Sequence, residues 1–142
     1  RWEKRYPEAF NYRYKMLKEA TATRFIRCAD GGSIYMGKAP ELAKCANYNV
    51  QRAALSIMAR AIFRHKVTMD AERTALGQRS TKLISTIHDA LIDETANRDA
   101  SKCLRLMKAD MIAGYTDIFP DAPTGRLVEG GIGQDWGHLE DA

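Results

Sequence analysis

Hydrophobic positions recur with a helical period in two long stretches of the chain. The first stretch covers residues 41–66, where the apolar side chains are Ala46, Val50, Ala54, Ile57, Met58, Ala61 and Ile62. The second covers residues 97–115, where the inner face is Ala100, Cys103, Leu104, Met107 and Met111. This spacing of three and four predicts two amphipathic helices with one buried face each. We expect Asn97 to cap the second helix and Gly114 to end it.

Shorter patterns predict a further helix and two hairpins. Pro7 suits the first turn of a helix over residues 7–20, and residues 68–80 are polar, as in a helical tail followed by a loop. Residues 24–28 and 33–36 flank Asp30-Gly31-Gly32, which is typical of a tight turn. Residues 81–94 predict a second hairpin, and residues 126–129 a short strand before a glycine-rich turn and Trp136. Because the strands pair locally, we predict an α+β fold with an antiparallel sheet and helices on one face.

Composition limits the class of protein. The chain has 142 residues, of which 45% are hydrophobic and 28% charged, as expected for one globular domain. No apolar run approaches the roughly 20 residues of a membrane span, so we expect a cytoplasmic protein with no membrane partner. The net charge of +4 permits a polyanionic partner without requiring one. The sequence begins at Arg1 and not at Met, so we expect a fragment.

The cysteines and histidines show no metal-binding spacing. Cys28, Cys45 and Cys103 are far apart and odd in number, which argues against a disulfide framework. The three histidines, His65, His88 and His138, add no zinc motif to them.

His88 and Asp89 stand at the predicted turn between two apolar, β-branched runs. A carboxylate fixed between rigid strands can bind a divalent cation, whereas a capped turn is the plain structural interpretation. Two-metal phosphoryl transfer needs a second carboxylate about 4 Å away, across the metal pair. Asp93 lies about 13 Å along the return strand, so it cannot complete such a site.

The long helix carries two polar ladders. Asn47 and Gln51 are four residues apart and share one face. Arg52, Ser56, Arg60 and Arg64 form the second ladder at the same step. The ladders fit either a solvated helix face or a helix that lies along a nucleic acid, with Arg on phosphates and amides on base edges or sugars.

The order of these motifs resembles the C-terminal part of a family-A (DNA polymerase I-like) DNA polymerase, closest to bacteriophage versions. The resemblance rests on Asn47-x-x-Val50-Gln51-x-x-Ala54 on a helix, His88-Asp89 after an apolar strand, and Val128-Glu129-x-Gly131-x-Gly133-x-x-Trp136. It covers nearly the whole chain, residues 1–142, as the C-terminal part of a polymerase palm. It implies addition of deoxynucleotides to a primer 3′ end on primer–template DNA, with deoxynucleoside triphosphates and Mg²⁺.

The resemblance also implies roles for individual residues. Asp89 resembles the motif-C aspartate that binds the catalytic Mg²⁺ ions, and His88 the residue beside the primer end. Gln51 and Asn47 resemble helix residues that touch the primer–template. Arg52 and Arg24 are the further DNA contacts that it suggests. The segment around Trp136 resembles the family's closing strand and tail.

Three departures from the family pattern qualify this interpretation. Ala90 replaces the usual Glu after the aspartate, Gly32 replaces the Arg of a Gly-Arg turn, and Arg52 replaces a Gly. The resemblance places the first metal-binding aspartate, the fingers helix that holds the triphosphate and any exonuclease domain outside this sequence. We therefore expect this chain alone not to polymerise and to need an N-terminal portion, in cis or as a second chain.

Three alternatives remain. One is a palm of a single-subunit phage-type RNA polymerase, which also has a His-Asp turn. Another is a degenerate, non-catalytic palm that binds DNA or a partner chain, favoured by Ala90. The last, an HD-type metal phosphohydrolase, needs upstream histidines on helices, and only His65 precedes His88.

Overall fold

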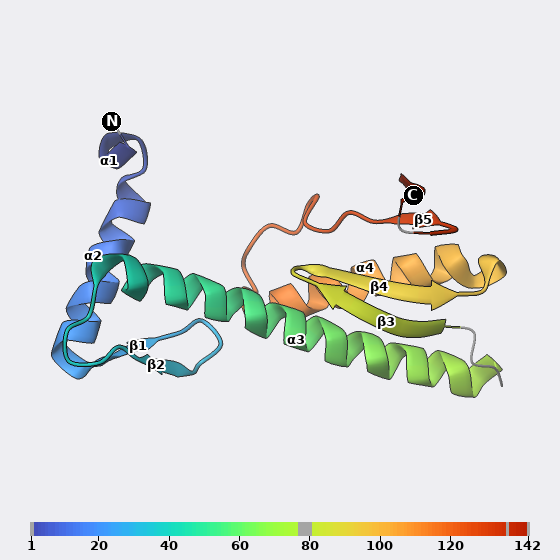
Figure 1. Ribbon diagram of the computed structural model, residues 1–142, viewed down its shortest axis with the longest axis horizontal. Coiled ribbons are helices and arrows are strands. Elements are labelled where there is room, and N and C mark those ends of the chain that lie inside the picture. Colours follow the sequence, from blue (N-terminus) through green and yellow to red (C-terminus); the bar gives the residue numbers. More distant parts are fainter. Residues whose placement is uncertain (1, 77–80, 136, 142) are drawn as a thin grey trace. The chain divides into compact units, whose positions relative to one another are not determined.

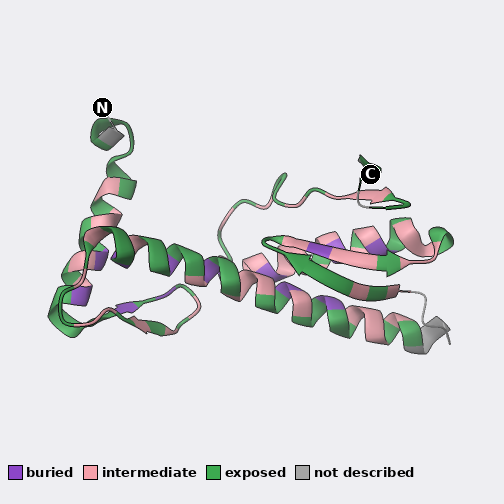
Figure 2. Ribbon diagram, in the orientation of Figure 1, coloured by how far each residue is buried: buried purple, intermediate pink, exposed green. Residues whose placement is uncertain are grey.

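The computed structural model describes residues 2–76, 81–135 and 137–141. The chain divides into two units, Arg1–Ser56 and Ile57–Ala142. The boundary falls within the long helix α3 (Leu42–Leu76), so residues 42–56 belong to the first unit and residues 57–76 to the second. Each unit has its own buried side chains (Figure 2). No helix in the described part of the chain is long and apolar enough to cross a bilayer.

The first unit contains two helices and one hairpin before α3 (Figure 1). Its elements are α1 (Trp2–Arg5), α2 (Pro7–Thr23), β1 (Phe25–Arg27) and β2 (Ser33–Tyr35). The helix predicted after Pro7 and the first hairpin are confirmed. Helix α2 ends where Arg24 adopts a left-handed conformation (φ 65°) and its N–H donates to the Ala20 carbonyl. The core joins α2, the hairpin and α3 through Met16, Ala20, Ile26 and Cys45.

The second unit places a hairpin alongside α3 and α4 (Figure 1). Its elements after α3 are β3 (Thr81–Ile87), β4 (Ala90–Thr95), η1 (Asn97–Asp99), α4 (Ala100–Thr116), β5 (Gly131–Gly133) and β6 (Leu139–Asp141). The hairpin predicted over residues 81–94 is confirmed, with Ile87 opposite Ala90 next to the turn. The buried face of α4 includes Cys103 and Met107, as predicted from their spacing.

The described strands form three two-stranded antiparallel sheets, β1–β2, β3–β4 and β5–β6. The α+β class is therefore confirmed. The single larger sheet of a palm is not formed by these strands, because each strand pairs only with its neighbour in sequence. The palm architecture stays a prediction.

Three local predictions were wrong. Asn97 does not cap α4: it begins the short η1 turn, and neither η1 nor α4 has a side-chain cap. Gly114 does not end α4, because it lies buried within the helix. Residues 126–129 form no strand; Arg126 takes a left-handed turn conformation (φ 58°), and the strand β5 follows at Gly131–Gly133.

The helix α3 extends to Leu76, so the helical tail predicted within residues 68–80 is confirmed and continues the helix predicted over residues 41–66 without a break. Ion pairs along its exposed side, Lys66 with Asp70 and Asp70 with Arg73, support the polar extension. Residues 77–80 of the predicted tail and loop, and Trp136 after the predicted glycine-rich turn, lie outside the described residues.

Candidate functional site

The His88–Asp89 pair forms the two-residue turn between β3 and β4 in the second unit. Both side chains are exposed. His88 has a left-handed backbone (φ 54°), which non-glycine residues adopt at an energetic cost. Strands of seven and six residues hold the turn on either side. The arrangement therefore presents a carboxylate and an imidazole at the tip of a rigid hairpin.

The surroundings of Asp89 contain no second acid from the return strand. Ala90, directly after Asp89, pairs with Ile87 in the β-ladder. Asp93 lies further along β4, where its side chain is only 4% exposed and bonds with His65. As predicted, Asp93 is not placed to complete a site at Asp89. Asp89 can thus contribute one oxygen-donor residue to a cation site.

The predicted DNA-contacting amides lie in the first unit. Asn47 and Gln51 are both exposed on α3, four residues apart, on one face as predicted. Arg24 is exposed at the end of α2. These three residues belong to one unit and the His88–Asp89 turn to the other.

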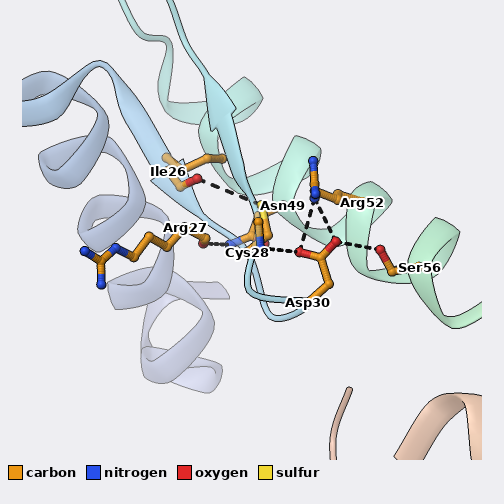
Figure 3. A network of polar contacts seen from close by, with 8 residues as sticks. Ile26, Arg27, Cys28, Asp30, Asn49, Arg52 and Ser56 are labelled. Carbon is orange, nitrogen blue, oxygen red and sulfur yellow. Dashed lines mark hydrogen bonds and ion pairs between the residues drawn. The ribbon is translucent and has the colours of Figure 1, made fainter. Parts of the chain in front are cut away.

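Arg52 is engaged within its own unit (Figure 3). Its Nε donates to both carboxylate oxygens of Asp30, at 2.9 and 3.2 Å. Ser56 Oγ and the backbone N–H of Gly32 also donate to Asp30, at 2.7 and 3.0 Å. The hydrogen bond from Ser56, with those from Gly32 and Arg52, holds the pKa of Asp30 below its usual value. This network ties the Asp-Gly-Gly turn to α3.

A buried amide fixes the same hairpin from the next turn of α3. Asn49 Nδ2 donates to the Arg27 carbonyl at 3.1 Å (Figure 3). Asn49 is buried, so this hydrogen bond is shielded from water. Asn49 and Arg52 together explain why a helix with few large apolar residues in this stretch still packs on the hairpin.

The other half of the arginine ladder is paired in the second unit. Arg64 forms a two-point contact with Asp117, from Nε at 2.9 Å and Nη2 at 2.7 Å. Arg60 lies 3.9 Å from the same carboxylate. Each arginine of the ladder therefore has an acidic partner, which supports the solvated-face interpretation for these side chains.

The most buried polar group of the second unit is His65 of α3, whose side chain is fully buried. Its Nε2 lies 2.6 Å from Asp93 Oδ2 and its Nδ1 lies 3.0 Å from Asp110 Oδ2. Thr68 donates to the other oxygen of Asp110, and the Cys103 thiol donates to Asp93 Oδ2 at 3.0 Å. We call His65, Thr68, Asp93, Cys103 and Asp110 the His65 cluster.

The environment of the His65 cluster shifts two pKa values. Burial lowers the pKa of His65, but the hydrogen bonds and charges of Asp93 and Asp110 outweigh it and raise the pKa above its ordinary value. Burial, followed by the hydrogen bond and charge of Asp93, raises the pKa of the Cys103 thiol to about 12. Asp93 and Asp110 thus favour the charged form of the His65 imidazole, and burial beside Asp93 favours the neutral thiol of Cys103.

The His65 cluster was not predicted from the sequence. Its members are spread from residue 65 to residue 110 and come from α3, β4 and α4. The signal was a histidine at a core-facing position of α3, with acids on the inward sides of β4 and α4. Sequence spacing could not show that these three elements meet.

A scan of the chain against protein-family models and searches of curated proteins and of solved structures find no match. The side chains themselves must therefore support any functional assignment.

Proposed function

We propose that this chain is part of the palm of a DNA-directed DNA polymerase of the family-A type, which adds deoxynucleotides to a primer 3′ end by two-metal phosphoryl transfer. One observation carries the proposal. The Asp89 carboxylate stands exposed at the tip of a rigid hairpin, next to His88, where the resemblance expects the metal-binding aspartate. The order of α2, the first hairpin, α3, the second hairpin and α4 supports it.

Asp89 suits Mg²⁺ as an exposed oxygen ligand, because Mg²⁺ binds proteins through one or two carboxylates and keeps several waters. When bound, the ions would polarise the phosphate and stabilise the attacking and leaving oxygens. Asp89 would hold them, and His88 would lie beside the primer end. The second carboxylate would come from polypeptide beyond these 142 residues, so the activity is proposed for the complete protein or for a complex.

Primer–template DNA would contact the exposed amides of α3. Asn47 and Gln51 can donate to and accept from base edges or sugars. The basic net charge of +4 would favour association with the phosphate backbone. Arg52 would hold the first hairpin in place through Asp30 and would also contribute positive charge toward the DNA. Arg24 would extend this basic surface.

Primer extension by the complete protein tests the catalytic role. Asp89→Asn keeps the size of the side chain and removes the charge that a metal needs. Loss of several kcal/mol of transition-state stabilisation corresponds to a fall of about 100-fold or more in rate. Glu94→Gln, an exposed acid on the same hairpin, is the matched control and should retain activity. Extension that survives Asp89→Asn would contradict the assignment.

DNA binding by the 142-residue chain tests the interface separately. We expect Asn47→Ala with Gln51→Ala to weaken binding of a fluorescent primer–template by about 30-fold, since each of two lost hydrogen bonds contributes about 1 kcal/mol. Asn11→Ala removes an exposed amide from α2 and serves as the control. Equal losses in the double variant and the control would speak against a specific contact.

Ala90 favours a second candidate, a non-catalytic palm that binds DNA. The small apolar side chain occupies the position where the family has an acid, and it is fitted into the β-ladder opposite Ile87. In that case Asp89→Asn would leave any extension unchanged, while the double substitution at Asn47 and Gln51 would still weaken DNA binding.

A further inference from the structure

The His65 cluster has a feature that hydrogen bonding within the chain does not explain. The Asp93 side chain is 4% exposed, and its Oδ1 is buried without a hydrogen-bond partner among the described residues. A buried carboxylate oxygen without a donor is costly, because nothing replaces its hydration. Its second oxygen already receives two donors, from His65 and Cys103. Asp93 Oδ1 thus lacks a hydrogen-bond donor among the described residues.

The donor atoms around Asp93 form a compact set. Three possible ligand atoms, one each from His65, Asp93 and Cys103, lie within 4.8 Å of one another. They are a ring nitrogen, a carboxylate oxygen and a sulfur, carried by α3, β4 and α4. Because His65 and Cys103 are buried, these atoms face each other and not solvent.

Asp110 supplies the support that a metal-binding histidine needs. Its Oδ2 accepts from His65 Nδ1, which leaves Nε2 directed at Asp93. Thr68 fixes Asp110 through its other oxygen. A carboxylate on the far nitrogen of a histidine sets the tautomer and the ring orientation in metal sites.

We propose that His65 Nε2, Cys103 Sγ and the Asp93 carboxylate form a binding site for a zinc-like divalent cation in the second unit, with Asp110 and Thr68 orienting His65. Imidazole, thiolate and carboxylate are the ligands that Zn²⁺ takes in proteins. A thiolate among three ligands disfavours Mg²⁺ and Ca²⁺, which bind through oxygen. Asp93 Oδ1 is available as a fourth donor.

Binding of the cation would replace two protons of the cluster with one divalent ion. Both ring nitrogens of His65 lie within hydrogen-bond distance of a carboxylate oxygen, so without a cation each would carry a proton, and Cys103 donates its S–H to Asp93. On binding, the cation displaces the Nε2 proton and the thiol proton, both of which pass to water. One divalent cation then stands in place of two protons, and the net charge of the buried cluster is unchanged. The cation would tie α3, β4 and α4 together, so binding would stabilise the fold.

The test titrates the metal-free 142-residue chain with Zn²⁺ and with Co²⁺. We expect about one equivalent of Zn²⁺ per chain against a chromophoric chelator, and a rise in the melting temperature. Co²⁺ should give a sulfur-to-cobalt charge-transfer band, which reports a thiolate ligand. Cys103→Ala should abolish the band, whereas Cys28→Ala, which removes a buried thiol from the first unit, should keep it.

Asp110→Asn is a second variant, since it keeps all three ligands and should weaken Zn²⁺ binding by about 10–100-fold. If Cys103→Ala fails to fold, Asp110→Asn still tests whether Zn²⁺ binding depends on the His65 cluster. Absence of Zn²⁺ binding by the unmodified chain, or a Co²⁺ complex without the sulfur band, would overturn the proposal. Weak binding without that band would be assigned to exposed His138, which lies beside Asp135.

Discussion

Gly114 of α4 packs directly against the backbone of Ala61 in α3. A Cβ atom placed on Gly114 would lie 2.8 Å from the Ala61 nitrogen and 3.0 Å from the Ile57 carbonyl oxygen. Ala61 is itself fully buried. The two helices therefore approach at a point where neither offers a large side chain, which is why a glycine occupies a helix interior.

We expect Gly114→Ala to destabilise the chain. Overpacking a tight contact costs about 1–3 kcal/mol, whereas alanine in a helix gains about 1 kcal/mol over glycine. The free energy of unfolding in urea should fall by up to about 2 kcal/mol. Ala109→Gly, at an exposed position of α4, measures the helix-propensity effect alone. A gain in stability from Gly114→Ala would mean that the helices do not approach so closely.

His65→Ala should be among the most destabilising single substitutions. It leaves the Asp93 carboxylate, whose side chain is 4% exposed, and the Asp110 carboxylate, 14% exposed, without the imidazole that both contact. Removal of one member of a buried charged set costs about 3–5 kcal/mol. Urea unfolding with a chelator present measures this loss, and His138→Ala, whose side chain is 82% exposed, should cost less than about 1 kcal/mol.

The Asp30 network predicts a loss of stability in acid. The pKa of Asp30 is lowered in the folded chain, so its contribution is present above the unfolded-state pKa of about 3.9. It is lost as the pH falls through the lower folded-state pKa. The difference in unfolding free energy between the unmodified chain and Asp30→Asn should therefore shrink below about pH 4. Asp121→Asn, at an exposed loop position, is the control. A constant difference down to pH 2 would contradict the network.

His88 should limit stability at the hairpin tip. Its φ of 54° costs a non-glycine residue about 1–2 kcal/mol, which glycine avoids. We expect His88→Gly to raise the free energy of unfolding by about 1 kcal/mol. Asp89→Gly, at the neighbouring position without a positive φ, should lower it. If His88 serves the primer end, the more stable variant would also lose activity, a common trade between stability and function.

The local elements were largely predictable because their signals are local. Pro7, the Asp30-Gly31-Gly32 turn and the spacing of Cys103 and Met107 each act within a few residues. The failure at Gly114 has a tertiary cause. Glycine near the end of a helical pattern predicts a helix end, but the close packing of α4 on α3 requires Gly114 inside the helix.

The sequence by itself determined the α+β class, both hairpins and the exposed His88–Asp89 turn, because hydrophobic period and turn chemistry are fixed by neighbouring residues. Only the tertiary structure decided which polar residues meet. It paired Arg52 with Asp30 and gathered His65, Asp93 and Cys103 from three elements. Such contacts depend on how helices and strands pack against one another, and the spacing of residues along the chain does not predict that packing.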